Sequence, residues 1–423
     1  MIELIVDDKN MVATFKIVIF EFSYIHMVIF TKLKELLIIK MNMYRFLSLS
    51  MLTFFLLLFI QCQERPYSVL EKRWTEERAW EWKKENGWMA GTNFNPSTSI
   101  NQLEFWQEDT YDPETIEREL EWSAELGMNL HRVYLHNLLW EQDSLGFVKR
   151  IDNYLKISES KGIKTLLVLL DDVWHPVPKL GKQPEPIPFV HNSGWVQAPG
   201  SAILGDSLRH FEVKNYIKGI MSHFAEDGRV VGWDLYNEPD NVSPIDPKYP
   251  DRGPEVKDKH IYTLALLKKT FKWAREVNPS QPLTVGLWKD PNTWGTLDSL
   301  SAIDKFAISN SDIISFHAYG DLNETRKKIE DLEKYNRPLL CTEYLARGEK
   351  NTFQNMLPLF KEKEVAAINW GFVAGKTNTA FPWSSWQEQF DSLPKVWHHD
   401  IYLPDKTPFD KKEIDFLKGI LMN

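Results

Sequence analysis

Two glutamates, Glu238 and Glu343, are the residues whose types and positions most directly suggest chemistry. Glu238 lies in the string Gly232–Pro239 (GWDLYNEP), and Glu343 follows the apolar run Pro338–Cys341. Each glutamate therefore ends a segment of the kind that forms a buried strand. Two facing carboxylates can divide one hydrolysis between them, because one protonates the leaving oxygen while the other attacks the carbon. Cleavage of a glycosidic bond requires such a pair.

The elements that must position these glutamates are read from Gly87 onward, where short apolar runs alternate with amphipathic helical stretches. Helical signals include Asp112-Pro113-Glu114, which is an N-cap followed by proline, and Gly127 as a helix stop. The helix between the fifth and sixth predicted strands has to come from residues 298–306. The predicted strands are residues 88–94, 129–135, 164–170, 230–235, 282–287, 313–316, 338–342 and 365–371. This alternation predicts an α/β fold, a (β/α)8 TIM barrel that forms a single catalytic domain over residues 88–423.

In such barrels the chemistry lies at the carboxyl ends of the strands. Strands four and seven lie across the mouth from each other, so Glu238 and Glu343 can face one another over a bound sugar. A carboxyl separation of roughly 5 to 5.5 Å would select double displacement. Glu238 then needs a setting that retains its proton, and Glu343 needs donors such as Arg132 and either Tyr319 or Tyr344.

The string Gly232–Pro239 at a strand end, taken with Glu343 at the end of strand seven, resembles glycoside hydrolase clan A. In that clan the acid/base and the nucleophile follow strands four and seven. Residues 88–400 are most similar to family five, the cellulase and mannanase family. The resemblance implies a retaining β-glycanase of mannan, glucan or xylan type, without a metal or other cofactor, in which Glu238 is the acid/base and Glu343 the nucleophile.

The resemblance also implies a substrate-binding set. Asn237 would contact the sugar 2-hydroxyl, Arg132 would support Glu343, and Trp370 matches the family's sugar platform. The family often carries a histidine pair after strand three, but the segment here is DDVWH, which leaves the subfamily open. The expected substrate-binding residues are Arg132, His175, Asn237, His317, Tyr319 and Trp370.

Composition limits the partners. The 423 residues carry a net charge of −9, so nucleic acid is excluded as an expected partner, because phosphate binding requires a basic face. The chain has 17 Trp and 14 Tyr, which either fill the core or line a carbohydrate cleft. For Trp383 and Trp386, outer sugar subsites and simple loop packing both stay open. The substrate partner is expected to be an oligo- or polysaccharide, and the protein is expected to be a monomer.

The N-terminal region resembles a targeting signal. Residues 41–62 contain Arg45, the apolar run Leu47–Ile60 and then Cys62, which is similar to a bacterial lipoprotein signal peptide with Gln61 in place of the usual small residue. We expect Cys62 to be lipidated and the protein to be exported and anchored to the membrane of a bacterial cell envelope, on the periplasmic or outer side. Residues 1–40 are interpreted as a misassigned upstream extension, and residues 63–87 as an N-terminal extension that packs on the barrel.

The residues admit two other readings. A barrel lipoprotein that binds glycans without cleaving them would most simply lack one carboxylate, and both are present. A Schiff-base or metal-dependent barrel could use Lys289 or Lys376, but no strand end shows clustered His and Asp with metal-ligand spacing. Cys341 is expected to be buried and inert.

Overall fold

The computed structural model describes residues 27, 29, 31–41, 73–242 and 254–422. The chain divides into two compact units, Met1–Ser68 and Val69–Asn423. In the first unit, residues 31–41 are helical, and the predicted signal peptide lies outside the described residues apart from Met41. None of the helices in the described part of the chain is long and apolar enough to cross a membrane.

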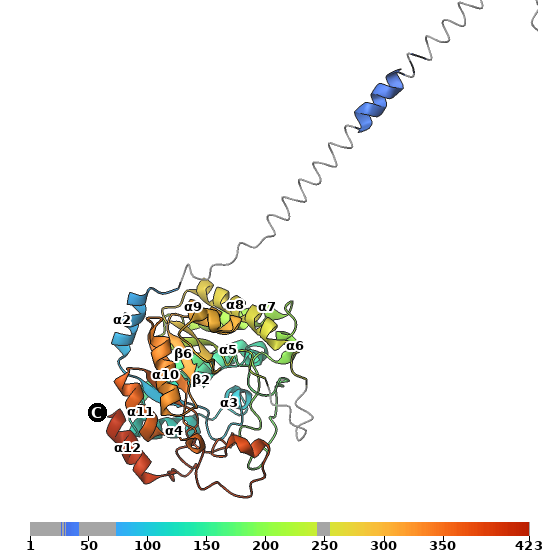
Figure 1. Ribbon diagram of the computed structural model, residues 1–423. Helices are drawn as coiled ribbons and strands as arrows, with labels where there is room; N and C mark the ends of the chain where they lie inside the picture. The colour runs from blue at the N-terminus through green and yellow to red at the C-terminus, as the bar shows by residue number, and fades with distance from the viewer. Residues whose placement is uncertain (1–26, 28, 30, 42–72, 243–253, 423) are drawn as a thin grey trace, which may run out of the picture. The chain divides into compact units, whose positions relative to one another are not determined.

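The second unit is built on a closed barrel of eight parallel strands, in which each strand pairs with the next and β8 pairs with β1. Figure 1 shows helices on the outside of this unit. The predicted TIM barrel is therefore confirmed, and each predicted strand overlaps an observed one. The strands are β1 (Ala90–Asn93), β2 (Leu130–Tyr134), β3 (Lys164–Val168), β4 (Val230–Asn237), β5 (Leu283–Leu287), β6 (Ile314–His317), β7 (Leu339–Glu343) and β8 (Ala366–Asn369).

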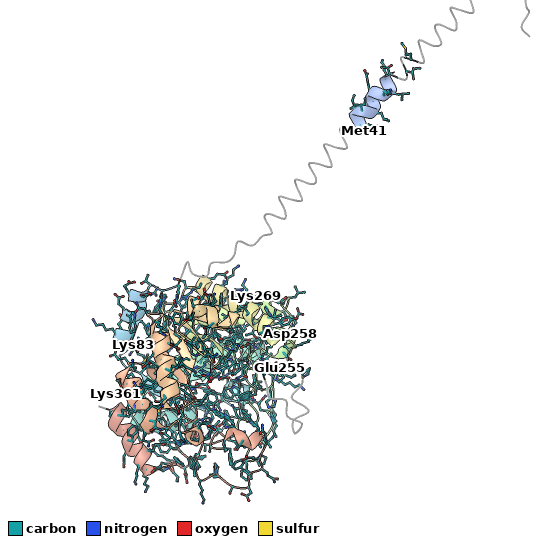
Figure 2. The ribbon with its side chains drawn as sticks, viewed as in Figure 1. Met41, Lys83, Glu255, Asp258, Lys269 and Lys361 are labelled. Carbon is teal, nitrogen blue, oxygen red and sulfur yellow. The ribbon has the colours of Figure 1, made fainter. Side chains whose placement is uncertain are left out.

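Helices surround this barrel. Those described are α2 (Glu76–Asn86), α3 (Gln102–Trp106), α4 (Pro113–Glu125), α5 (Asn137–Ser160), α6 (Ser201–Leu204), α7 (His210–His223), α8 (Lys259–Val277), α9 (Ala302–Asn310), α10 (Leu322–Glu333), α11 (Phe353–Glu362) and α12 (Lys411–Leu421), with short 3-10 helices η3 (Leu297–Ser299), η4 (Arg347–Glu349) and η5 (Trp383–Trp386). The last helix is held to its neighbour partly by Lys361 of α11 (Figure 2), whose Nζ donates to the carbonyl of Ile420 at 2.8 Å.

The helices begin where the sequence provides a cap. The Asp112 carboxylate accepts from the Thr115 backbone N–H, Pro113 follows at the first helical position, and the helix buries Ile116 and Leu120 against the core. Gly127, with φ at +87°, ends the helical segment in the left-handed conformation that glycine favours.

The helix between β5 and β6 begins four residues later than predicted. Ser301 caps α9 by accepting from the Asp304 N–H at 3.2 Å, and the preceding residues Leu297–Ser299 form the separate 3-10 turn η3. The helix after β2, α5, starts at Asn137 and bends at Asp143 before continuing to Ser160.

The amino end of the barrel is closed by α2 and the residues before it. Trp74 and Trp82 join an apolar cluster with strand residues such as Leu166 and Val231, and the Trp82 indole donates to the Val231 carbonyl at 3.0 Å. Because this packing closes the amino end of the barrel, the carboxyl ends of the strands form the face available for a site. Two long connections cover that face: the β3 loop (residues 169–200) and the β8 loop (residues 370–410).

Candidate active site

Glu238 lies one residue beyond β4 with a left-handed backbone, φ +44°. Its N–H donates to the Gly286 carbonyl at 3.0 Å, so the β4–β5 pairing extends to the glutamate itself. A positive φ is uncommon in a residue with a side chain and recurs at functional sites. Here it turns the chain sharply at Pro239 and leaves the carboxyl directed into the barrel mouth, where it lines a cavity.

The surroundings of Glu238 favour its protonated form. Its Oε1 lies 2.7 Å from His317 Nδ1, and its Oε2 accepts from the Asn241 amide. Burial raises the pKa of Glu238 to about 7, although the Asn241 bond and the charge of Arg132 act in the opposite direction. The group can therefore hold a proton near neutral pH, as a general acid must.

Glu343 ends β7 in the opposite kind of environment. Its Oε1 accepts from Arg132 Nη1 at 2.9 Å and from the Tyr134 hydroxyl at 2.9 Å, while its Oε2 accepts from the Tyr319 hydroxyl at 2.8 Å. Three donors, one of them the buried and positively charged Arg132, stabilise the carboxylate anion. A carboxylate held in this state can act as a nucleophile.

The two glutamates lie close enough to act on one bond. One side-chain oxygen of Glu238, one of Glu343 and a ring nitrogen of His317 all lie within 4.8 Å of one another. That spacing is close to the roughly 5 to 5.5 Å that distinguishes double displacement from direct attack by water. The same three groups could in principle ligate a metal, but the Arg132 guanidinium already binds Glu343 and its charge repels a cation.

Arg132 lies beneath the cavity rather than along its wall. The prediction grouped Arg132 with the substrate-binding residues as a support for Glu343, and the structure places it fully buried in contact with Glu343. Asp234 Oδ2 accepts from its Nε at 3.0 Å and its Nη2 at 2.9 Å, and Asn237 Oδ1 accepts from Nη2 at 2.7 Å. Because every edge of the guanidinium is engaged, Arg132 positions the carboxylate and does not touch a ligand.

Four of the predicted residues line one cavity of about 820 Å³, open to solvent, together with Glu238 and Glu343; we call it the site cavity. They are Asn237, His317, Tyr319 and Trp370. The Asn237 amide is oriented by Asp171, whose Oδ1 accepts from Nδ2 at 2.9 Å. Burial lowers the pKa of His317 to about 4, so its ring is neutral beside Glu238.

His175 is not brought to the site cavity. Its backbone pairs with Val196 within the β3 loop, and its Nε2 lies 2.6 Å from the Ser193 carbonyl. The structure therefore does not bring His175 together with the other predicted site residues, because its contacts lie within the β3 loop. The histidines of the cavity wall are instead His191, His317 and His399.

Several contributing residues were missed or left open by the sequence analysis. Tyr134 lies two residues after Arg132 on β2, so the two-residue period of a strand places both side chains on the barrel's inner face and could have identified it. Asn241 and Trp288 carried no distinguishing signal. Trp383 and Trp386 both line the site cavity, as does Trp174 of the β3 loop.

Comparison with known proteins gives a consistent result. Residues 89–380 match the family model Cellulase (glycosyl hydrolase family 5). A family 5 glycoside hydrolase of subfamily 18 from Streptomyces cattleya, in complex with Manβ1-4GlcNAc, is similar at 12% identity and a TM-score of 0.51, over 79% of this chain and 80% of that one. The endo-β-1,4-mannanase from Thermotoga petrophila is similar at 12% identity and a TM-score of 0.50, over 81% of this chain and 77% of that one. These likenesses establish the shared fold. No curated protein matches the sequence.

Proposed function

Because the chain belongs to glycosyl hydrolase family 5, the cellulase family, and is therefore a β-glycoside hydrolase, we propose that it cleaves a β-linked glycan by double displacement with net retention. The observation that carries this proposal is the pair Glu238 and Glu343, which lie within 4.8 Å of each other in opposite electrostatic settings. One setting retains a proton near neutral pH and the other stabilises an anion, and these are the two states that the first step needs.

In the first step the Glu343 carboxylate attacks the anomeric carbon while Glu238 passes its proton to the glycosidic oxygen. The carbon–oxygen bond to the leaving group breaks, and a covalent glycosyl ester forms on Glu343. In the second step the ionised Glu238 takes a proton from water as the water oxygen attacks the same carbon. The ester bond breaks, Glu343 is released as a carboxylate, and Glu238 is again protonated.

The surrounding residues serve these two steps. Arg132 and the hydroxyls of Tyr134 and Tyr319 hold the Glu343 carboxylate in place through hydrogen bonds to its two oxygens. His317 is neutral, so it orients Glu238 through Nδ1 without stabilising the deprotonated acid by a full charge. We assign the Asn237 amide to the sugar 2-hydroxyl and the half-buried Trp370 ring to the sugar face, where a flat apolar surface suits an aromatic ring.

The substrate is proposed as an oligo- or polysaccharide of mannan, glucan or xylan type. Beside Trp370, the cavity wall carries Trp174, Trp288, Trp383 and Trp386, and such rings stack on pyranose faces of each of these sugars. The choice among them depends on hydroxyl contacts in loops rather than on the barrel. Turnover of a panel of 4-nitrophenyl β-glycosides, followed by the corresponding polysaccharides, would identify the sugar.

The test of the mechanism uses Glu343→Ala. This variant should lose at least about 10³-fold in kcat, because the covalent step is removed. Azide should partly restore turnover of an activated aryl β-glycoside, and the product should be the α-glycosyl azide, because azide enters from the face that the carboxylate has left. An inverted sugar product from the unchanged enzyme would contradict double displacement. Glycan binding without any turnover would favour a non-catalytic barrel.

We also propose that the enzyme works at a bacterial envelope, exported and anchored through a lipid on Cys62. Support comes from the order of Arg45, the apolar run Leu47–Ile60 and Cys62 in the sequence. Expression in a bacterium fed labelled palmitate should label the full chain but not the Cys62→Ser variant. Equal labelling of the two proteins would contradict the assignment.

A further inference from the structure

The β3 loop and the β8 loop are joined to each other directly. The Asn192 N–H donates to the Thr377 carbonyl at 2.7 Å, and the His191 N–H donates to Ser385 Oγ at 2.9 Å across 194 positions of sequence. The Trp386 indole N–H donates to the His191 carbonyl at 2.8 Å. We call these contacts, between residues 187–192 and residues 377–386, the inter-loop bridge.

The order of strands fixes what this bridge covers. Going round the barrel from β8, the next strands are β1, β2 and β3, so a connection from the β8 loop to the β3 loop spans the β1–β2 side of the mouth. The residues that line the site cavity come from the β3 loop, the ends of β4 to β7 and the β8 loop, and none of them belongs to β1 or β2. The site cavity therefore stops at the bridge.

A second set of contacts, deeper in the barrel mouth than the inter-loop bridge, closes the same β1–β2 side. Tyr134, Trp195 and Trp370 contact one another edge to face, with ring centroids 5.1, 5.6 and 5.8 Å apart, and we call them the aromatic wall. The Trp195 ring is fixed because its N–H donates to buried Asp171 at 2.7 Å. The Tyr134 hydroxyl is fixed by Glu343 itself at 2.9 Å.

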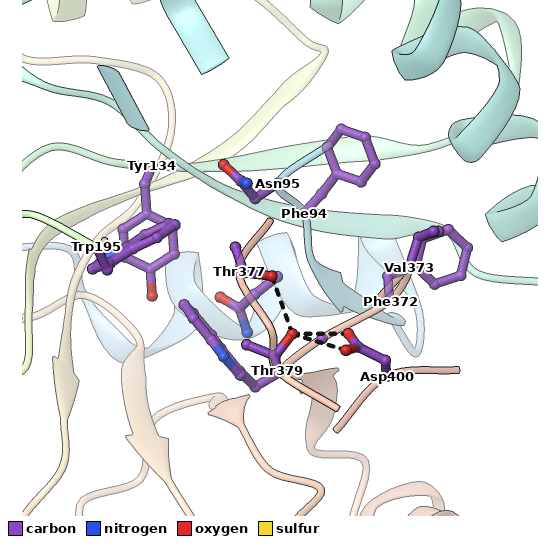
Figure 3. Close-up of a pocket in the computed structure, with 12 residues that line it drawn as sticks. Phe94, Asn95, Tyr134, Trp195, Phe372, Val373, Thr377, Thr379 and Asp400 are labelled. Carbon is purple, nitrogen blue, oxygen red and sulfur yellow. Dashed lines mark hydrogen bonds between the residues drawn. The ribbon is translucent and has the colours of Figure 1, made fainter. Parts of the chain in front are cut away.

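Behind the aromatic wall, the residues that the structure describes line a recess. It measures about 340 Å³ and is lined by Asn95 after β1 and by Thr377, Thr379 and Asp400 of the β8 loop. Figure 3 shows Tyr134 and Trp195 on one side of this recess and the Thr379–Asp400 hydrogen bonds on the other. Asp400 and Thr379 are both buried, and the Thr379 hydroxyl donates to the Asp400 carboxylate, so these two polar groups of the recess are engaged within the protein.

The position of Glu238, the acid, sets the direction in which a glycan chain binds. Glu238 must lie beside the glycosidic oxygen, so the leaving group extends from Glu238 past Asn241 and Trp288, which line the cavity beyond β4 and β5. The sugar that is attacked lies on the other side of that oxygen and faces the aromatic wall. Since Tyr134 of the wall donates directly to the nucleophile, the wall lies next to the point of cleavage.

We propose that the enzyme is exo-acting and removes one sugar at a time from the non-reducing end of a β-linked chain. This inference rests on the proposed hydrolase function and adds its mode of attack. A pocket that is closed beyond one sugar binds chain ends and excludes internal residues, because a further sugar would overlap Trp195 or Trp370. The preferred substrates are therefore short β-linked oligosaccharides and the ends of longer chains.

The first experiment follows products with time. Linear β-1,4-linked hexasaccharides of mannose, glucose and xylose, each labelled at the reducing end, are incubated with the enzyme. The expected first products are the free monosaccharide and the labelled pentasaccharide. Labelled di-, tri- and tetrasaccharides appearing at the start would overturn the exo assignment. Turnover of 4-nitrophenyl β-monosaccharides is measured in parallel: if it persists, only the mode of attack is wrong, and if no glycoside is cleaved, both proposals fail.

The second experiment blocks the chain end. Aryl β-disaccharides of mannose and glucose carrying a 4,6-O-benzylidene group on the terminal sugar should be hydrolysed at least about 100-fold more slowly than unblocked ones, because the added ring meets the wall. Comparable rates would overturn the proposal.

A double variant tests the role of the bridge. In Trp174→Ala/Trp386→Ala, which removes the ring contact at 5.1 Å and one bond of the bridge, the ratio of blocked to unblocked rates should rise at least tenfold. The matched control is Trp80→Ala, a 41% exposed tryptophan on α2 at the amino end of the barrel, which should leave the ratio unchanged. An unchanged ratio in a folded double variant would remove the bridge from the explanation.

Discussion

The pH dependence of turnover should be controlled by the amide of Asn241. This side chain donates to Glu238 Oε2 and so stabilises the ionised acid. Asn241→Ala removes that donor while the burial that raises the pKa of Glu238 to about 7 remains. The pKa must therefore rise further, and the alkaline limb of the activity profile must move to higher pH, because activity needs the protonated acid.

The size of the shift follows from the strength of one bond. A hydrogen bond to a charged group contributes about 1.5 to 3 kcal/mol, and one pKa unit corresponds to about 1.4 kcal/mol. Loss of the Asn241 donor should therefore raise the pKa of Glu238 from about 7 to about 8 or above. At pH 8 the unchanged enzyme would retain about a tenth of its plateau kcat/KM, and the variant about half.

The assay is kcat/KM for an aryl β-glycoside with a poor leaving group, measured from pH 4 to pH 10. The matched control is Asn153→Ala, an exposed asparagine on α5 that should leave the profile unchanged. If the midpoint of the alkaline limb stays near pH 7 in Asn241→Ala, or moves to lower pH, Glu238 is not the acid whose ionisation limits the reaction.

Three further predictions concern single side chains. Glu238→Ala should lose about 10² to 10⁴-fold in kcat/KM on poor leaving groups and much less on 2,4-dinitrophenyl glycosides, which leave unprotonated; equal losses on both would argue against an acid role. Tyr134→Phe should lower kcat/KM by roughly 10 to 100-fold, since one donor to charged Glu343 is removed, and an unchanged value would show that Arg132 and Tyr319 suffice. Burial raises the pKa of Asp400 from 3.8 to about 7, so the native state binds this proton more tightly than the unfolded chain and its stability falls as pH rises from about 4 to 7. Between pH 5 and pH 8 the unchanged protein should therefore lose about 3 kcal/mol more unfolding free energy in urea than Asp400→Asn, and parallel losses would contradict this.

The barrel and the two glutamates could be predicted because their signals are local. Each strand contains a short apolar run, Glu238 directly follows β4 and Glu343 ends β7, so strand order alone brings the two glutamates to one mouth. Tyr134 was within reach of the same reasoning, since it shares a strand face with Arg132.

The loops could not be predicted in the same way. The inter-loop bridge consists largely of bonds to backbone groups nearly two hundred positions apart, such as Trp386 to the His191 carbonyl, and backbone groups are the same in every residue. The position of His175 likewise depends on how the β3 loop turns back on itself through Ser193, which no local pattern in the segment DDVWH reveals.

The left-handed backbone of Glu238 has a consequence for protein engineering. A side chain held at φ +44° costs on the order of 1 to 3 kcal/mol, and glycine would adopt that conformation without the penalty. A residue that the reaction needs is thus one of those whose replacement by glycine would relieve backbone strain. Directed evolution that selects only for melting temperature should therefore favour Glu238→Gly and yield a more stable but inactive barrel. Alternating rounds that select for turnover would retain the glutamate.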